Sequence, residues 1–442
     1  MFCYIIADDG KRNVFFMAND YQGDVQEFAQ IVPIPVVPKR EQVRVSNNDV
    51  IQALDNFTAP RLVEYVDEPC SAEYTLYLWL AGITTVISIS IWLIRNWGWG
   101  VFLTICFLLG LLITVSLPSL FLTQANKGGF SGEQALNVVT VEDQFTVGEY
   151  DIAILSAIES NSLTDWLVNN GYKIPAKAEP MLQSYIQQGM KFFVTKVNLE
   201  AFQKQGYGFL RPIVLDYKSD QFMLPIRLGT LNAVADQDLT VYILSRDTNK
   251  FAEVANYRTL LIPTDAKSKS NQISTEELPE FIRDDFGNFY QSLFQKEYER
   301  SGQNAAFLEY AGPLPIRRSL KCDPCLSPPL YKFLGLPELL KQESLEDFYT
   351  VTRLHIRYNE QNFPQDLIFR EVSDQDILLQ AKEEGKIFSS SPVLFQGRYV
   401  IRRPADGAFY LSGFHYRSFR NQWADNLAKL TGWNLQEIKK KM

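Results

Sequence analysis

The clearest feature of the hydrophobic pattern is a pair of uncharged apolar runs in the first third of the chain. The first run extends from Tyr74 to Ile94, and the second extends from Gly100 to Thr123. At ~1.5 Å per residue, each run would cover roughly 30 Å as a helix, about the thickness of a bilayer's hydrocarbon core. Neither run shows the charged stripe of a helix at the surface of a soluble core. The pattern therefore predicts two transmembrane helices.

The link between the two runs, RNWGWG, is short, so the two helices should form a hairpin with both flanking parts on one side. Trp97 and Trp99 suit the headgroup region of a membrane. Arg95 is the single charge of the link, and the positive-inside rule therefore predicts a cytoplasmic link and extracytoplasmic flanking parts. Because neither run contains an ionisable side chain, we expect an anchor and not a transport pathway.

Outside the hairpin, short β-prone runs alternate with short stretches of helical period. The predicted strands lie in residues 3–18 around the turn Asp9-Gly10, and in 31–39, 138–157, 191–199, 213–217, 223–231, 239–247, 351–358 and 397–403. The predicted helices lie near 47–57, 162–171, 179–189, 282–300 and 423–430. We expect an α+β fold, mainly antiparallel sheet with flanking helices, into which the transmembrane hairpin is inserted.

A chain of 442 residues is too long for one hydrophobic core and suggests several domains. We expect a β-rich N-terminal part in residues 1–73, the hairpin in 74–123 and a main α+β domain in 124–320 that folds together with 1–73. The remaining residues, 321–442, should form a C-terminal α+β region.

The charge balance excludes one class of partner. The net charge is -8 and the pI is near 5.1, whereas nucleic-acid binding needs clustered Lys and Arg. The one basic run, Lys439-Lys440-Lys441, follows an amphipathic stretch and suits a helix C-terminus. We therefore expect no nucleic-acid partner, and no sequence motif indicates a cofactor.

The sharpest local motif is Cys322-Asp323-Pro324-Cys325, in a chain of five cysteines. A structural disulfide is the favoured interpretation, either within this pair or from one of its thiols to Cys70 or Cys3. A redox dithiol is the second interpretation, and half of a zinc site is the third. Cys106 lies inside the second apolar run, where a disulfide is not expected.

The chain has two histidines, His355 and His415, and no G-x-S-x-G, H-E-x-x-H, P-loop or EF-hand motif. His355 lies between Arg353 and Arg357 on an alternating strand, and cations on a shared face would lower its pKa. We expect His355 to be a hydrogen-bonding strand residue. The residues do not predict an enzymatic activity.

Many short segments, in this order, resemble one bacterial family of exported proteins, known as domain of unknown function 2330 and frequent in cyanobacteria. They are MANDYQGD, IVPIPVV, TAPRLVEY, FTVGEYDI with ILSA, WLVNNGYKIP, QGMKFFVTKVNL, MLPIRLG, FLEYA, KCDPC, TRLHIRY, FPQDL, FQGRYV and LAKLTGWN. The resemblance implies an extracytoplasmic protein and assigns no catalytic residue.

Two features depart from that family. Its members begin with a signal peptide and a Phe-Cys-Gly segment, whereas this sequence begins Met1-Phe2-Cys3. Either the true start lies upstream, or the N-terminal part is translocated, or the orientation is reversed. The predicted hairpin also replaces a variable Pro/Ala/Gly-rich linker after Pro69-Cys70, and a variable surface loop tolerates insertions.

Together these patterns predict a membrane-anchored extracytoplasmic binding or assembly protein, acting as a subunit of a larger membrane complex. Its expected partners are the lipid bilayer and other membrane or envelope proteins. The alternative is an envelope enzyme with a thiol-disulfide centre at Cys322 and Cys325.

Overall fold

The computed structural model describes residues 2–8, 12–18, 28–67, 139–205, 210–233, 235–246, 250–264, 277–314, 349–373, 375–376, 395–404 and 411–442. The strands are β1 (Phe2–Asp8), β2 (Arg12–Ala18), β3 (Ala29–Ile34), β4 (Val43–Val45), β5 (Arg61–Asp67), β6 (Val139–Val147), β7 (Tyr150–Ala157), β8 (Lys191–Val197), β9 (Ile213–Lys218), β10 (Met223–Leu224), β11 (Gln237–Ser245), β12 (Lys250–Val254), β13 (Arg258–Leu261), β14 (Ala305–Leu314), β15 (Tyr349–Tyr358), β16 (Leu367–Ser373), β17 (Phe395–Gln396) and β18 (Arg398–Pro404). The helices are α1 (Asp49–Thr58), α4 (Ser160–Asn169), α5 (Ala178–Gln187), α6 (Leu199–Gln205), α7 (Phe286–Arg300), α11 (Leu411–Thr431) and α12 (Leu435–Lys441), with 3-10 turns η2 (Arg40–Gln42), η4 (Arg227–Asn232) and η5 (Glu280–Arg283).

The predicted transmembrane hairpin, residues 74–123, lies outside the described residues. Among the residues that are described, no helix is both long and apolar enough to cross a membrane. The hairpin therefore stays a prediction from the sequence.

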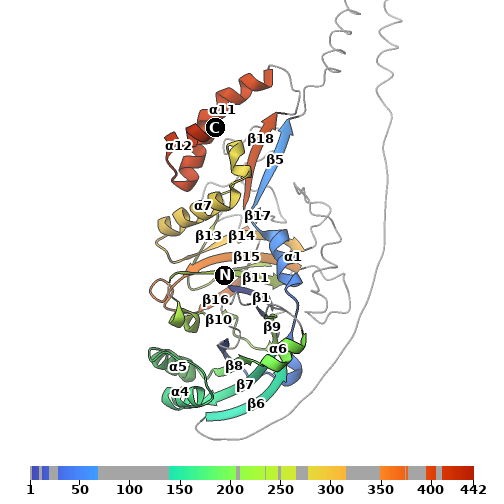
Figure 1. Cartoon of the computed structure of the whole chain (residues 1–442), viewed down its shortest axis with the longest axis vertical. Helices are drawn as coiled ribbons and strands as arrows, with labels where there is room; N and C mark the ends of the chain where they lie inside the picture. Colours follow the sequence, from blue (N-terminus) through green and yellow to red (C-terminus); the bar gives the residue numbers. More distant parts are fainter. Residues whose placement is uncertain are drawn as a thin grey trace, which may run out of the picture.

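The central element is a nine-stranded sheet with the order β13-β14-β15-β11-β1-β2-β9-β4, and β17 pairs with β14 (Figure 1). Most described strand pairs are antiparallel, and the parallel pairs are β1 with β11, β13 with β14 and β5 with β18. The fold is thus mixed α+β with mainly antiparallel sheets, as the sequence predicts.

Both faces of the central sheet are buried, and strand β2 shows how. Its alternating side chains divide between two cores. Phe15 and Met17 belong to the large core shared with the second sheet, whereas Val14 and Phe16 pack with helix α1. A strand buried on both sides has a continuous apolar run in its sequence, and VFFMA in β2 is one.

The second sheet has the order β3-β8-β7-β6 and lies at one end of the molecule (Figure 1). Leu155 and Phe192 face a separate core with helices α4 and α5, while Ile154 and Phe193 join the large core. The extended segment expected at 31–39 contributes β3, an edge strand that pairs with β8 alone among the described strands. Its position at the edge suits Pro33, which has no backbone N–H to donate.

Several predicted elements are confirmed, and two differ. The first two strands pair antiparallel, and α1 and α4 begin within two residues of expectation. The strand predicted over 223–231 ends at Leu224, because Pro225 follows and the backbone N–H groups of Ile226 and Arg227 donate to Asp366. The helix predicted from Ile282 instead begins at Phe286, after the separate turn η5.

The β6–β7 turn is clamped by a buried ion pair. Glu149 is 1 % exposed and accepts from the Arg211 side chain (Nη2–Oε2 2.7 Å) and from the Arg211 backbone N–H. Tyr150 donates to the Arg211 carbonyl oxygen. Gly148 makes the turn with φ +59°, and a Cβ there would lie 2.8 Å from Arg211 Nη2 and 2.9 Å from Val45.

We predict that Gly148→Ala destabilises the protein by at least about 2 kcal/mol, since it adds a clash to left-handed backbone strain. Gly189→Ala is the matched control, because Gly189 has φ +74° with no atom within 4 Å of the added Cβ. It should cost about 1 kcal/mol. Urea unfolding of both variants measures the difference in their stability. Equal losses of stability would contradict the prediction, because the Arg211 side chain would then move away from the added Cβ at no cost.

Candidate binding cleft

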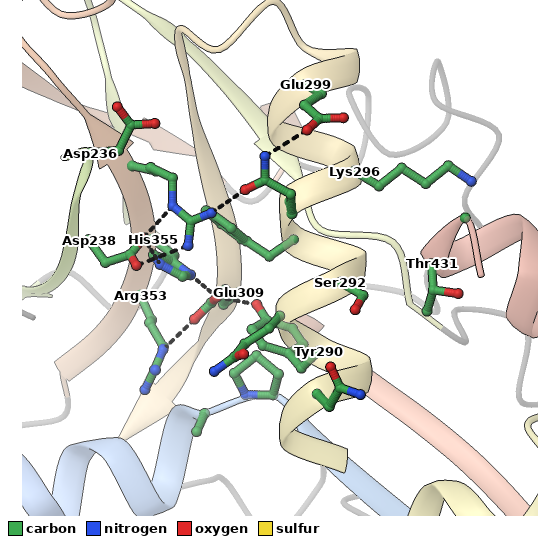
Figure 2. Close-up of a pocket in the computed structure, with 18 of the residues that line it drawn as sticks. Asp236, Asp238, Tyr290, Ser292, Lys296, Glu299, Glu309, Arg353, His355 and Thr431 are labelled. Atoms are coloured by element: carbon green, nitrogen blue, oxygen red, sulfur yellow. Dashed lines mark hydrogen bonds and ion pairs between the residues drawn. The ribbon is translucent and has the colours of Figure 1, made fainter. Parts of the chain in front are cut away.

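A cleft of about 1240 Å³ lies where helix α7 crosses the central sheet. Its walls come from α1, β11, β14, β15, α7 and the turn after α11, and Figure 2 shows the charged wall beside α7. The lining residues are Asp55, Ala59, Pro60, Asp236, Gln237, Asp238, Asn288, Tyr290, Gln291, Ser292, Phe294, Gln295, Lys296, Glu299, Glu309, Arg353, His355, Arg357, Thr431 and Gly432.

Strand β15 supplies three cationic side chains to this wall. Arg353, His355 and Arg357 occupy alternate positions, so they project from the same face of the sheet. The intervening residues Leu354 and Ile356 are fully buried in the large core on the opposite face. The strand thus combines an apolar face with a basic one.

A β-bulge in β14 positions Glu309, the carboxylate that pairs with these cations. Leu308 pairs with Leu354 and Tyr310 pairs with Arg353, so Glu309 is the extra residue between them. Without the bulge, neighbouring side chains would alternate between the two faces. The bulge brings Glu309 to the face that carries Arg353 and His355, and its side chain contacts both.

Glu309 is fully buried and is held from three directions. Arg353 Nε donates to Oε2 at 2.6 Å, His355 Nδ1 lies 2.9 Å from Oε1, and the Tyr290 hydroxyl donates to Oε1. Burial alone would raise the pKa of Glu309, but Arg353 and His355 outweigh it and lower the pKa to about 2. The carboxylate is therefore charged at neutral pH.

His355 is held between two carboxylates. Its Nδ1 contacts Glu309, its Nε2 lies 3.3 Å from Asp238 Oδ1, and its ring stacks on Phe294 at 3.8 Å between centroids. Burial lowers the pKa of His355, but Glu309 and Asp238 outweigh burial and raise it above its ordinary value. Cations do share its face, yet the expected lowering of its pKa is wrong because both ring nitrogens meet carboxylates.

The two arginines extend the network to neighbouring elements. Arg357 binds Asp238 through Nε and Nη2, both at 2.9 Å, and donates to Gln295 of α7. This bidentate pair helps lower the pKa of Asp238 against the effect of burial. Arg353 Nη1 donates to Asp55 of α1 and lies 2.9 Å from the hydroxyl of Tyr242. The network therefore ties α1 and α7 to the sheet.

The chemistry of this wall makes its histidine a poor proton acceptor. Both nitrogens of His355 have carboxylate partners and its pKa is raised, so the ring is a poor general base at neutral pH. Among the described residues, no group of three or more His, Cys, Asp or Glu side chains is placed to hold a metal ion.

The rest of the cleft is polar and lies along α7. The polar side chains that α7 contributes to the cleft recur at helical spacing. They are Asn288, Gln291, Ser292, Gln295 and Glu299. Figure 2 shows that Ser292, Lys296 and Thr431 lie on the side of α7 away from His355, so the cleft continues around the helix. Ser292 also accepts from the indole N–H of Trp433.

Most of the site residues predicted from the sequence lie outside the residues that the structure describes. The residues outside the described ranges are Cys70, Cys322, Cys325, the predicted span limits Tyr74, Ile94, Gly100 and Thr123, and the link residue Arg95. Cys3 is described only by its backbone in β1. Sequence reasoning singled out His355, Arg353 and Arg357 but missed Glu309 and Asp238. A single charge inside the apolar run AAFLEYAG was the available signal for Glu309.

The fold and site define a mixed α+β protein with a charge-compensated polar cleft. Residues 3–370 match the family described as uncharacterized protein conserved in bacteria (DUF2330), and the chain belongs to that family. No curated protein and no solved structure matches the chain.

We predict that Arg353→Met destabilises the protein by about 3–5 kcal/mol, because it leaves the Glu309 charge buried without its main partner. Arg357→Met should cost about 1 kcal/mol, since its partner Asp238 keeps 35 % of its side chain exposed. Chemical denaturation measures both.

The double variant Arg353→Met/Glu309→Gln separates the origins of this loss. The introduced glutamine carries no charge, so the double variant should recover part of the stability lost in Arg353→Met. Equal losses for the two arginine variants, with no recovery in the double variant, would contradict a dominant role for the Glu309 charge.

Proposed function

We propose that the protein is a membrane-anchored, extracytoplasmic binding protein that assembles with other membrane or envelope proteins through the cleft beside α7. The observation that carries the proposal is the pairing of charges along the cleft wall. The charged side chains of the wall pair with one another through hydrogen bonds, which holds the wall in one geometry. They are Glu309, Asp238, Arg353, His355 and Arg357. A preorganised wall loses little freedom when it binds a partner.

Size and charge indicate the kind of occupant. Small-molecule pockets typically enclose ~300–1,000 Å³ and are mostly apolar. This cleft is larger, at about 1240 Å³, and is lined mainly by polar side chains. The lining cations are Arg353, His355, Arg357 and Lys296, and the anions are Asp55, Asp236, Asp238, Glu299 and Glu309. Near balance of charge favours a polar, weakly charged chain segment of a partner protein.

The anchoring part of the proposal rests on the sequence. Residues 74–94 and 100–123 contain no charged side chain, and Arg95 is the charge between them. Both features suit a two-helix anchor with a cytoplasmic link and an extracytoplasmic body. The alternative, a thiol-disulfide enzyme centred on Cys322 and Cys325, rests on residues outside those that the structure describes.

Site-specific photocrosslinking in intact cells tests the proposal. Gln291 is an exposed residue of the cleft, and Gln203 on α6 is an exposed control outside it. With p-benzoylphenylalanine at Gln291, we expect a discrete adduct with another protein in the carbonate-resistant membrane fraction. The same probe at Gln203 should give none.

Two outcomes would refute different parts of this proposal. Absence of an adduct at Gln291, or the same adducts at both positions, would argue against the cleft as the binding surface. Release of the chain by carbonate would argue against the anchor, whatever the crosslinking shows.

A further inference from the structure

The cleft beside α7 exposes its anions and its cations to different extents. The three cationic side chains of β15 are mostly covered, since Arg353, His355 and Arg357 keep 6 %, 12 % and 19 % of their side chains exposed. The carboxylates that pair with them are more open, because Asp55 keeps 48 % and Asp238 keeps 35 % exposed. The cations of this wall therefore lie beneath the surface that an occupant meets.

Two further carboxylates of the cleft, Asp236 and Glu299, are exposed. Their hydrogen bonds come from neutral groups. Asn359 and the Tyr298 hydroxyl donate to Asp236. Gln295 donates to Glu299. In the described part of the chain, neither carboxylate forms an ion pair, so no cation offsets the charge of either one directly.

The fourth cation of the cleft lies on another side of α7. The Lys296 ammonium donates to the carbonyl of Lys429 in the last turn of α11, and Figure 2 shows Lys296 on the side of the helix away from His355. The number of charged residues is close to balance, but the part of the cleft over β15 exposes mainly negative charge. A surface of one sign attracts an occupant of the opposite sign.

The positions of the carboxylates indicate the form of that occupant. Asp55 pairs with Arg353 at one place on β15. Asp238 pairs with Arg357 four positions further along the strand, about 13 Å away at ~3.3 Å per residue. A metal ion binds oxygen ligands within ~2.6 Å, so one ion does not reach carboxylates at both places. An extended chain of four or five residues does cover this distance.

We infer that the cleft binds a segment of the partner protein whose few charges are lysine or arginine side chains. These cations face the exposed carboxylates, while the covered cations of β15 hold the wall in shape. Opposite charges across an interface speed the encounter and discriminate against partners of the wrong charge. The inference rests on the proposed function, because it names the chemistry of the partner at the same cleft.

Crosslinking in intact cells, combined with charge variants of the full chain, tests the inference. With p-benzoylphenylalanine at Gln291, mass spectrometry of the adduct identifies the captured segment, in which we expect lysine or arginine next to the crosslinked position. Asp236→Asn/Glu299→Gln should lower the yield of the adduct several-fold. The introduced amides keep a hydrogen-bond acceptor at both positions and remove only the charges.

Asp165→Asn/Glu179→Gln is the matched control. Asp165 on α4 and Glu179 on α5 are exposed and do not line the cleft, so this double variant should leave the yield unchanged. A charge reversal separates a lost contact from a folding defect. Glu299→Lys should lower the yield further, and changing the basic residue of the captured segment to glutamate should restore it.

An adduct at Gln291 that the charge variants of the cleft leave unchanged would overturn the inference and leave the cleft as a binding surface. A captured segment without lysine or arginine, or a charge reversal in the partner that restores nothing, would do the same. Absence of any adduct at Gln291 would instead refute the proposed function and, with it, this inference.

Discussion

The burial of one carboxylate, that of Glu309, constrains much of the described structure. A charge removed from water must find partners, and Glu309 finds Arg353, His355 and Tyr290. These partners belong to β15 and α7, so the helix must dock on the sheet in one position to complete the set. The bulge in β14 is the local feature that makes this possible, because it turns Glu309 to the face of its partners.

The same network explains the character of the cleft. Arg353 connects Glu309 to Asp55 of α1, and Arg357 connects Asp238 to Gln295 of α7. One network of ion pairs and hydrogen bonds therefore sets the positions of both helices that border the cleft. Its charged groups are engaged with each other, which fixes the shape of this wall. The hairpin that we propose contains no ionisable residue in either apolar run, and it therefore fits an anchor and not a transport pathway.

Local features of the fold could be predicted from the sequence, and features that depend on distant residues could not. The apolar run of β2 and the helical period of α1 are local, and both predictions are confirmed. The segment after Leu224 was predicted as a strand because its competitor, Asp366, lies about 140 residues away. The predicted direction of the His355 pKa shift was wrong for the same reason. Its arginine neighbours are visible in the sequence, whereas Glu309 and Asp238 lie 46 and 117 residues away.

The most direct test of this account is the protonation state of His355. The chain has two histidines, so selective ¹⁵N-histidine labelling gives a simple spectrum, and a His415→Gln variant assigns it. The account predicts that the midpoint of the His355 titration lies above the ordinary value for histidine, because its two ring nitrogens face Glu309 and Asp238, which raise its pKa. A midpoint at or below the ordinary value would contradict the account, since the two carboxylates would then not stabilise the protonated ring.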